Sequence, residues 1–571
     1  MFDIKRLLQY EFFPTELPPC FTSSDLATHA KEAVNLTNNV RQDYSIPLTY
    51  SGYKSQSARR KFAVPNPYHY CKAADFLVKN ESDFQKIFEK SSYSLTAPTK
   101  HAPQQSQPYA RRSSTVADTR RVIELLYQNN RYEIRLDINS FFDSIYTHSL
   151  PWAIHGRAQA KRERNNKNLL GNRLDVLVRA MNYNQTNGIL VGNAISRIVS
   201  EVLLCTVDSS IKARFPNLAC CHFVDDYYIY TTDSSNIQEI ISFLRAEFAK
   251  YELSFNENKL QINESPFLYE KPWVEQIKQY IHLQPDVFLS KLVMEYNVHK
   301  DIGIIKYGLR IISQCRYTKE DWPQMQSRLL NIWVCFPSLS DRILAILWQN
   351  MSLLKKSPLK KAIYSVMDES LRLNREQELV WAVWFAKVFD IQMSTEKIAR
   401  VLKSSNDLAI IVTLDIIFTN GLKDSRVILE QRKRIREELD AANVDDSGKS
   451  NILMWTSRWL LAYEANRQKW LNFPDNPLEY ARKNSFFKGL LEKDIKFYDP
   501  NFVYPKPTER TKNYEYATRS ELYAAIQKLK ELIAKRIGQT DQQKRLTLTE
   551  EENMLYEQFI NDLEANEQIY R

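Results

Sequence analysis

The stretch ACCHFVDDYYIYTT, residues 219–232, holds two adjacent carboxylates between runs of β-branched and aromatic residues. Such residues favour strands, so the pattern predicts a β-hairpin whose tight turn carries Asp225 and Asp226. Upstream, RYEIRLDINSFFDSIY (131–146) predicts a short strand that ends at Asp137 and runs into an aromatic cluster. Three acidic side chains are therefore available to converge.

Converging carboxylates raise one another's pKa by repulsion unless a cation neutralises them. Mg²⁺ prefers oxygen ligands and usually binds through one or two carboxylates together with substrate phosphates. Two such ions can hold the attacking and leaving oxygens of an in-line phosphoryl transfer. The acids therefore predict a divalent-metal site. Ordinary turn chemistry is the alternative, because Asp tolerates left-handed backbone and bonds to its own backbone.

The segments around these acids follow a definite order. Between them lies NGILVGNAISRIVSEVLLCTVD (187–208), in which Gly188 and Gly192 precede a helical apolar pattern. The chain has 11 glycines in 571 residues, far below the usual ~7%. Two glycines four residues apart therefore suggest a backbone that another group approaches closely. After the hairpin, LSFNENKLQI (253–262) places Lys259 behind an Asn-rich turn.

In this order the four segments resemble the palm of reverse transcriptases. LDINSFFDSIY resembles their first catalytic motif, GILVGNAISR their second, FVDD their third and LSFNENKL their fourth. SIYTHSLPWAIHGRAQAK (144–161) is more particular: it resembles the bacterial abortive-infection polymerases of the AbiK type and related defence-associated reverse transcriptases. Several of those enzymes make DNA without a template, and some prime synthesis on their own tyrosine. The resemblance covers roughly residues 55–265.

The resemblance implies a role for individual side chains. Asp137 and Asp225 correspond to the metal ligands, and Asp226 to the supporting acid of the same metal site. Lys259 corresponds to a charge or proton donor beside the leaving pyrophosphate. Phe142 corresponds to a bulky ring under the sugar that leaves no room for a 2′-hydroxyl, and an ordinary core aromatic is the alternative.

The second and third motifs depart from the reverse transcriptase pattern. Phe223 replaces the usual tyrosine, which removes only a hydroxyl. Gly192 keeps its place in the second motif at the incoming nucleotide, but Val191 replaces the common glutamine before it, and Arg197 replaces a proline. A polar contact near the incoming base pair is thereby lost. Nucleotidyl transfer is therefore a firmer expectation than faithful template copying.

Basic residues lie near the proposed site in two segments. SARRKFAVPNPYHYCKAADFLVK (57–79) resembles the fingers segment that grips the nucleotide triphosphate. Guanidinium groups donate paired hydrogen bonds to phosphate, which predicts substrate contacts for Arg59 and Arg60. A solvated basic run is the alternative. RAQAKRERNNKNLLGNR (157–173) predicts either a contact with a nucleic-acid backbone or an exposed helix and loop.

Protein priming requires a tyrosine hydroxyl within reach of the metals. Residues 1–55 offer Tyr10, Tyr44, Tyr50 and Tyr53 as candidates. Packing or surface positions are the alternative for all four, because tyrosine serves both.

Length and composition limit the class of protein. A chain of 571 residues should contain more than one core. The net charge of +10, from 78 basic and 68 acidic residues, permits a nucleic-acid partner. The 7 cysteines show no paired metal spacing, which fits a reducing compartment. No apolar run approaches the ~18 residues of a membrane span, so we expect a cytoplasmic protein without membrane contact.

Past about residue 270, helical periodicity replaces the polymerase-like motifs. The apolar repeats predict helices in QPDVFLSKLVMEY, MQSRLLNIWVCF, SDRILAILWQNMSLL, LVWAVWFAKVFDI and NDLAIIVTLDIIF, and in the tail at 521–538 and 549–564. The expected fold is α+β: reverse-transcriptase-like fingers and palm with an antiparallel sheet over residues 1–270, then an all-α, HEAT-like domain over 271–571. A generic helical bundle is the competing architecture for the second part.

Together these features predict an antiphage DNA polymerase that adds dNTPs by a two-metal mechanism with Mg²⁺ or Mn²⁺. Synthesis is expected to need no template and to start on a tyrosine, so that the DNA product is covalently attached, and the resemblance also implies a homo-oligomer. One alternative is an RNA-templated reverse transcriptase of a defence system, which would bind RNA. The other is a non-catalytic nucleic-acid-binding scaffold.

Overall fold

The computed structural model describes residues 1–504, apart from short gaps at 56–57, 102, 104–105, 114–115, 268–270, 282, 316, 446–447, 449 and 475. The described strands all lie in its first half: β1 (Leu48–Tyr53), β2 (Arg59–Val64), β3 (Tyr132–Asp137), β4 (Ala219–Phe223), β5 (Asp226–Thr231) and β6 (Gln261–Glu264). The α-helices of this half are α1 (Ile4–Gln9), α2 (Ser24–Thr28), α3 (Ala30–Leu36), α4 (Pro67–Lys79), α5 (Glu81–Phe88), α6 (Val116–Tyr127), α7 (Phe141–Ser144), α8 (Ser149–His155), α9 (Arg157–Arg162), α10 (Leu170–Met181), α11 (Ala194–Arg214) and α12 (Asn236–Ala249).

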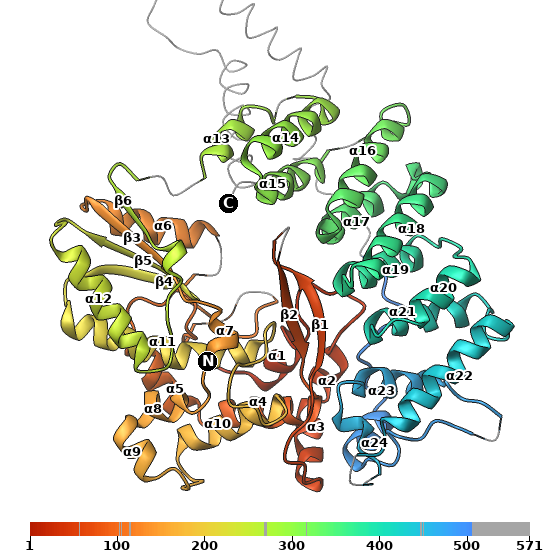
Figure 1. Ribbon diagram of the computed structural model, residues 1–571, viewed down its shortest axis with the longest axis horizontal. Helices are drawn as coiled ribbons and strands as arrows, with labels where there is room; N and C mark the ends of the chain where they lie inside the picture. The colour runs from red at the N-terminus through yellow and green to blue at the C-terminus, as the bar shows by residue number, and fades with distance from the viewer. Residues whose placement is uncertain are drawn as a thin grey trace, which may run out of the picture.

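Two separate antiparallel sheets carry the predicted motifs. The four-stranded sheet has the order β4-β5-β3-β6, and β1 pairs with β2 in a hairpin of its own (Figure 1). The expected strand before Asp137 is β3, and the expected hairpin is β4 and β5. Its turn differs slightly from the prediction, because Asp226 is already the first residue of β5 and pairs with Phe223.

The four-stranded sheet is covered on both faces. Tyr227 and Ile229 of β5 point into the main core with the long helix α11, while Tyr230 packs with Ile123 of α6 on the other face. This separation follows from the alternation of side chains along a strand. A strand that is buried on both faces carries few polar residues, which makes the polar ones on β4 and β5 informative.

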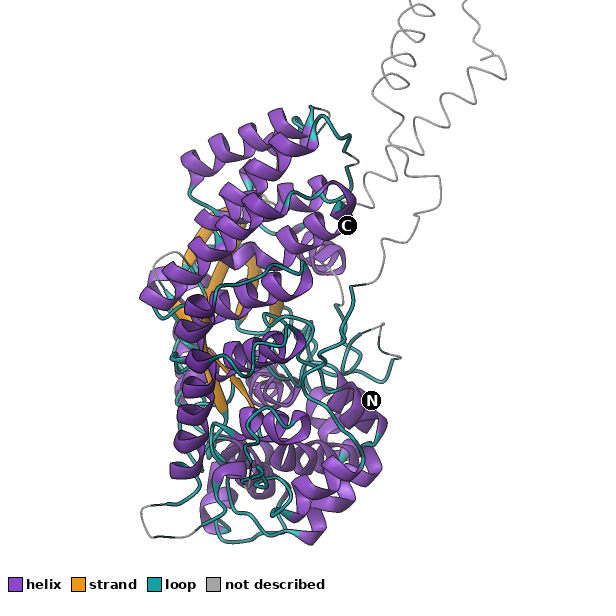
Figure 2. Ribbon diagram, turned by 90° about the vertical axis from the view of Figure 1, so that its right-hand side faces the viewer, coloured by secondary structure: helices purple, strands orange, loops and turns teal. Residues whose placement is uncertain are grey.

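The second half consists of helices, which form an arc around the first half (Figure 1). They are α13 (Pro272–Lys278), α14 (Pro285–His299), α15 (Ile302–Ile312), α16 (Trp322–Cys335), α17 (Ser340–Gln349), α18 (Lys356–Arg372), α19 (Glu376–Val388), α20 (Thr395–Leu402), α21 (Asp407–Thr419), α22 (Arg426–Ala441), α23 (Trp459–Gln468) and α24 (Ser485–Glu492). In the side view these helices lie in front of the strands (Figure 2).

The predicted helices of the second half that fall on described residues are present as α14, α16, α17, α19 and α21. Consecutive helices such as α14 with α15 and α18 with α19 pack side by side. The two tail helices expected at 521–538 and 549–564 lie outside the described residues. Within the described part, no single helix has the length and apolarity to cross a membrane, and one pair, Trp322–Cys335 with Pro337–Gln349, passes that test jointly but is bent by 119°.

The arc is joined to the first half near its C-terminal end and in its middle. Near its end, Thr22 donates a backbone hydrogen bond to the carbonyl of Phe497 at 3.0 Å. The rings of Phe12 and Phe497 stack with centroids 5.8 Å apart. In the middle, the N-terminal end of α19 packs against β1. The hairpin of β1 and β2, called the fingers-like hairpin below, therefore packs against the helical half.

Candidate active site

The predicted acids meet where β3 ends and β5 begins. Asp137 lies directly opposite Asp226 in the antiparallel register. The next backbone amide, of Ile138, donates to the carbonyl of Asp225 at 3.2 Å. The amide of Asn256 donates to the carbonyl of Asp137 at 2.8 Å, which brings the segment that carries Lys259 to the same edge. These backbone hydrogen bonds alone bring the four predicted residues, Asp137, Asp225, Asp226 and Lys259, to one edge of the sheet.

The turn between β4 and β5 has an unusual backbone. Val224 has a φ of +55°, in the left-handed region that β-branched residues rarely adopt. Its amide donates to the hydroxyl of Thr96 at 3.1 Å. A conformation of this kind persists only where the surroundings hold it in place, and such positions concentrate at functional sites.

The three carboxylates influence one another's charge. The pKa of Asp226 is raised from 3.8 to about 6, first by burial and then by the charges of Asp225 and Asp137. Burial and Asp137 also raise the pKa of Asp225. Lys259 places Nζ 2.8 Å from Oδ2 of Asp137. One lysine thus partly neutralises a pocket that holds three acids, and the pocket would gain from more positive charge.

The donor atoms of this pocket suit a hard cation. Among the described residues, no group of three His, Cys, Asp or Glu side chains is already set at metal-ligand spacing. Mg²⁺, however, takes only one or two protein carboxylates and fills its other positions with water and phosphate oxygens. Asp137, Asp225 and Asp226 supply carboxylate oxygens, and the raised pKa values of Asp225 and Asp226 show unrelieved negative charge. These residues fit a divalent cation.

The raised pKa of Asp226 predicts how metal binding depends on pH. A cation binds the charged carboxylate, so below about pH 6 it must displace a proton from Asp226. We expect the apparent affinity for Mn²⁺ to be constant above pH 7 and to fall by up to about tenfold per pH unit below 6. Electron paramagnetic resonance titrations with Mn²⁺ at pH 5, 6 and 7.5 measure it. Asp226→Asn should remove the step at pH 6, and an unchanged step there would contradict its assignment to Asp226.

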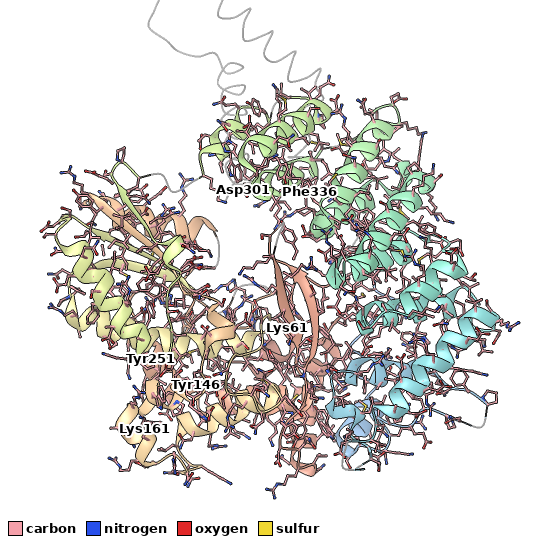
Figure 3. All side chains as sticks on the ribbon, viewed as in Figure 1. Lys61, Tyr146, Lys161, Tyr251, Asp301 and Phe336 are labelled. Atoms are coloured by element: carbon pink, nitrogen blue, oxygen red, sulfur yellow. The ribbon has the colours of Figure 1, made fainter. Side chains whose placement is uncertain are left out.

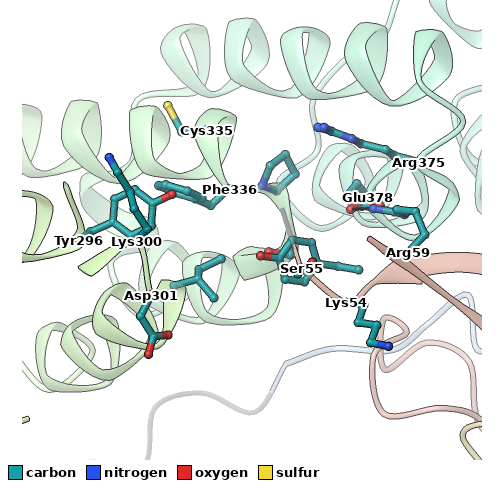
Figure 4. Close-up of a pocket in the computed structure, with 14 residues that line it drawn as sticks. Lys54, Ser55, Arg59, Tyr296, Lys300, Asp301, Cys335, Phe336, Arg375 and Glu378 are labelled. Atoms are coloured by element: carbon teal, nitrogen blue, oxygen red, sulfur yellow. Dashed lines mark hydrogen bonds and ion pairs between the residues drawn. The ribbon is translucent and has the colours of Figure 1, made fainter. Parts of the chain in front are cut away.

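The two arginines of β2 lie on opposite faces of the fingers-like hairpin. Arg60 points to the opposite side from Arg59, and its positive charge lowers the pKa of Asp225. Arg59 points the other way, to α19, where its guanidinium forms a two-pronged ion pair with Glu378 at 2.5 and 2.7 Å (Figure 4). The prediction of a substrate contact for Arg59 therefore disagrees with the structure, because neighbouring residues of a strand point to opposite faces.

Two further predicted site residues are Gly192, in the segment before α11, and Phe142, in α7. Gly192 has a φ of +104°, and a Cβ there would lie 2.7 Å from Pro14 and 3.2 Å from Phe62. The N-terminal segment and the β1–β2 hairpin of the chain itself thus approach this glycine, and its contact with a nucleotide stays a prediction. Phe142 is half-buried at the rim of the core. Its role at the sugar stays a prediction.

The four candidate tyrosines differ in access. Tyr50 is buried, stacks on Phe62 and leaves its hydroxyl without a hydrogen-bond partner, so its hydroxyl does not reach solvent. Tyr44 is 40% exposed, and its ring packs on Tyr183. Tyr10 is half-buried, with the guanidinium of Arg6 5.0 Å from its ring centroid.

Tyr53 lines a cavity of about 450 Å³ between the hairpin tip and the helical half (Figure 4). Tyr296, Lys300 and Phe336 line the opposite wall. Burial raises the pKa of the Tyr53 phenol, and Tyr296 adds to this. The cavity lies on the Arg59 face of the hairpin, and Asp301 and Glu378 also line it.

The basic run at 157–173 lies on and after α9. In Figure 3 its Lys161 lies at the outer edge of the first half, whereas Lys61 of the hairpin lies near the centre. Arg157 lies over the ring of Trp152, 4.6 Å from its centroid, and is 3.9 Å from Glu252. This placement agrees with the exposed-helix alternative.

Sequence reasoning missed the buried polar residues beneath the turn. Asp208 and Glu201 of α11 are buried, as is His222 of β4. In the sequence, these three residues are recognisable only as polar residues at otherwise apolar positions of a strand and a helix. That pattern does not show which residues they bind.

Comparisons with known proteins cover part of the chain. Residues 82–278 match the family model described as reverse transcriptase (RNA-dependent DNA polymerase). That range contains Asp137, Asp225, Asp226 and Lys259, and the match supports a nucleotidyl transferase of the reverse transcriptase type. The chain is similar to the solved structure of telomerase from Candida albicans in complex with the TWJ fragment of telomeric RNA, with 12% identity, a TM-score of 0.27, and coverage of 63% of this chain and 67% of that chain. No curated protein sequence matches.

Proposed function

We propose that this chain is a DNA polymerase that adds dNTPs with the help of Mg²⁺ or Mn²⁺, without a template, and starts each product on one of its own tyrosines. The observation that carries the nucleotidyl transfer is the meeting of Asp137, Asp225 and Asp226 at one sheet edge. This edge lies inside the segment that matches the reverse transcriptase model.

The residues divide the work of an in-line phosphoryl transfer. Asp137, Asp225 and Asp226 would hold the divalent cations, which when bound supply positive charge to the phosphate oxygens and to the attacking hydroxyl. The attacking oxygen bonds to the α-phosphorus of the dNTP while the bond to the β-phosphate oxygen breaks. The hydroxyl proton passes to solvent and pyrophosphate leaves. Catalysis of this kind is mostly positioning and charge stabilisation.

Two basic side chains are placed to assist. Arg60 lies on the opposite face of the hairpin from Arg59, where its positive charge acts on Asp225 and where it would bind the triphosphate. Lys259 is 2.8 Å from Asp137, and its ammonium would turn from that carboxylate to the leaving pyrophosphate once the acids are neutralised. The positive charge of Lys259 thus balances the Asp137 carboxylate before substrate binds and the pyrophosphate afterwards.

The absence of a template is proposed from Val191, where the polar contact near the base pair is missing. Of the four tyrosines, Tyr50 is too deeply buried to act as a primer, which leaves Tyr10, Tyr44 and Tyr53. The covalent DNA product, the role in antiphage defence and the homo-oligomer are proposed from the resemblance to the AbiK-type polymerases. The HEAT-like stacking is proposed from the succession of helices in the second half, and the cytoplasmic location from the cysteine spacing and the apolar runs of the sequence.

The test is incubation of the purified full chain with labelled dNTPs and Mg²⁺, with and without an added primer–template. We expect label to grow on the protein without template and to resist denaturation, with the attached tyrosine identified by mass spectrometry. Strict dependence on an added template would contradict the proposal. Only one of the three single substitutions, Tyr10→Phe, Tyr44→Phe or Tyr53→Phe, should abolish attachment. Tyr50→Phe, at a buried tyrosine, is the control and should leave attachment unchanged.

A second candidate is an RNA-templated reverse transcriptase, which the description of the matching family model favours. Such an enzyme would copy a bound RNA, so ribonuclease treatment of the purified protein should end synthesis. Sequencing of the product separates the two: a copy of one RNA supports the templated enzyme, and a sequence without any template supports the first proposal.

Phe142 predicts the choice of sugar. A half-buried ring at that position would collide with a 2′-hydroxyl, so Phe142→Ala should admit ribonucleotides. We expect the preference for dATP over ATP, as a ratio of kcat/KM, to fall by about 10- to 100-fold, the scale of one lost steric contact. Phe141→Leu serves as a control, because Phe141 is buried in the core next to it. An unchanged ratio in Phe142→Ala would leave Phe142 as a packing residue.

A further inference from the structure

A buried histidine lies directly beneath the catalytic turn. His222 of β4 is 0% exposed. Its Nδ1 is 2.9 Å from the carbonyl oxygen of Val224, and its Nε2 is 2.9 Å from Oδ2 of Asp208. A carbonyl and a carboxylate only accept hydrogen bonds, so both ring nitrogens must donate. The ring is therefore an imidazolium, a positive charge buried below the turn that carries Asp225.

Asp208 is held in place as the counter-charge. It extends from α11 and accepts hydrogen bonds from the hydroxyl of Tyr227, at 3.0 Å, and from that of Ser91. The imidazole also stacks on the ring of Tyr227, with centroids 4.5 Å apart and planes 17° apart. Burial lowers the pKa of His222, but Asp208 and the other contacts outweigh it and raise the pKa to about 9. The pair is thus matched in charge and in hydrogen bonds.

The opposite side of Val224 is held by a second acid of the same helix. The amide of Val224 donates to Thr96 Oγ1 at 3.1 Å, and Thr96 in turn donates to Oε1 of Glu201 at 2.6 Å. Both polar backbone groups of Val224 are therefore bound through side chains that end on α11. The turn has no freedom to relax from its left-handed φ of +55° without breaking one of these links.

We infer that His222 is a positioning residue for the nucleotidyl-transfer site: it clamps Val224 in its left-handed conformation and thereby fixes the direction in which Asp225 and Asp226 present their carboxylates. The inference rests on the proposed function. His222 itself touches neither substrate nor metal. It acts through the carbonyl of Val224, as outer partners of metal ligands do when they orient them.

The experiment must separate positioning from plain stability. His222→Phe keeps the ring shape but leaves the Asp208 charge buried and unpaired, so it can fail to fold. His222→Phe/Asp208→Asn removes both charges and keeps a planar ring that can stack on Tyr227. We expect this double variant to keep the melting temperature of the wild type within a few degrees. Its Mn²⁺ affinity and its kcat should fall by about 10- to 100-fold, the usual cost of losing such a partner, with the KM for dNTP at saturating metal little changed.

The chain offers a second His–Asp pair as a control. His148, directly before α8, and Asp175 of α10 are 2.9 Å apart, and His148 is partly exposed where His222 is buried. His148→Phe/Asp175→Asn makes the same two substitutions away from the turn, and it should leave both the Mn²⁺ affinity and kcat at the wild-type level. Equal losses in the two double variants would overturn the inference, because they would reflect general loosening of the fold.

Two readouts do not depend on polymerisation. Nitrogen-15 spectra of the full chain labelled at histidine should show one side chain with both nitrogens protonated at pH 8, absent in the His222 variant. Mn²⁺ titration by electron paramagnetic resonance reports the carboxylates directly. A neutral His222, or wild-type Mn²⁺ affinity and kcat in the folded double variant, would overturn the inference. A wild type that shows the protonated ring and binds Mn²⁺ but transfers no nucleotide would overturn the proposed function instead.

Discussion

Replacing Asp225 with asparagine should lower the rate of dNTP addition by about 10³-fold or more, because one lost carboxylate removes several kcal/mol of metal-mediated charge stabilisation. The same change should not destabilise the fold. Burial and Asp137 raise the pKa of Asp225, so its charge is unfavourable in the metal-free protein above that pKa. We therefore expect an equal or higher melting temperature at pH 8 in the absence of metal.

The measurement pairs single-turnover dNTP addition with thermal denaturation. Asp233→Asn is the control, since Asp233 is an exposed aspartate just beyond β5 whose carboxylate accepts hydrogen bonds from the amide and the hydroxyl of Ser235, at 2.9 and 2.7 Å. Its rate should match the wild type. Wild-type activity in Asp225→Asn would remove the basis of the two-metal mechanism, and so of the polymerase itself.

Arg59 and Arg60 should give opposite phenotypes although they are adjacent. Arg60→Ala should raise the KM for dNTP by about 10- to 100-fold, because one charge-assisted phosphate contact is worth about 1.5–3 kcal/mol. Its melting temperature should not change. Arg59→Ala should lower the melting temperature, because Glu378, with only 3% of its side chain exposed, loses its cation. Arg59 is about a third exposed, so we expect about 1–3 kcal/mol, below the full cost of a broken buried pair.

A charge reversal tests the assignment of the ion pair. Arg59→Glu should be worse than Arg59→Ala, and Arg59→Glu/Glu378→Arg should recover most of the melting temperature. The corresponding pair Arg60→Glu/Glu378→Arg should recover nothing, because Arg60 lies on the other face of the strand. Recovery in both pairs, or in neither, would contradict the orientation of β2.

Local pattern was enough to place the catalytic strands. The alternation around Asp137 and the aromatic run after Asp226 predicted β3, β4 and β5. This works because successive side chains of a strand point to opposite faces, so burial alternates from one residue to the next. The order of the motifs then brought Lys259 to the acids. The helices of the second half that lie on described residues also followed from apolar periodicity.

The contacts that the sequence did not reveal join residues far apart in the chain. Arg59 looks like a phosphate-binding residue until Glu378, more than 300 positions away, is seen to hold it. The sequence predicts a close approach at Gly192, but it does not identify Pro14 and Phe62 as the groups that make it. His222 stood in an apolar strand with no visible partner. Nothing in local periodicity encodes which distant side chain satisfies a buried polar group.

The C-terminal end of the helical arc closes on the N-terminal segment through Thr22, Phe12 and Phe497, and its middle packs against β1. If the chain were cut between β6 and α13, each of the two pieces would therefore lack side chains that complete its own core. Neither piece is a self-sufficient module, but co-expressed they should find each other and restore the whole, as the halves of a split reporter do. The point in the sequence where the polymerase motifs stop is thus not a boundary between two independently folding domains.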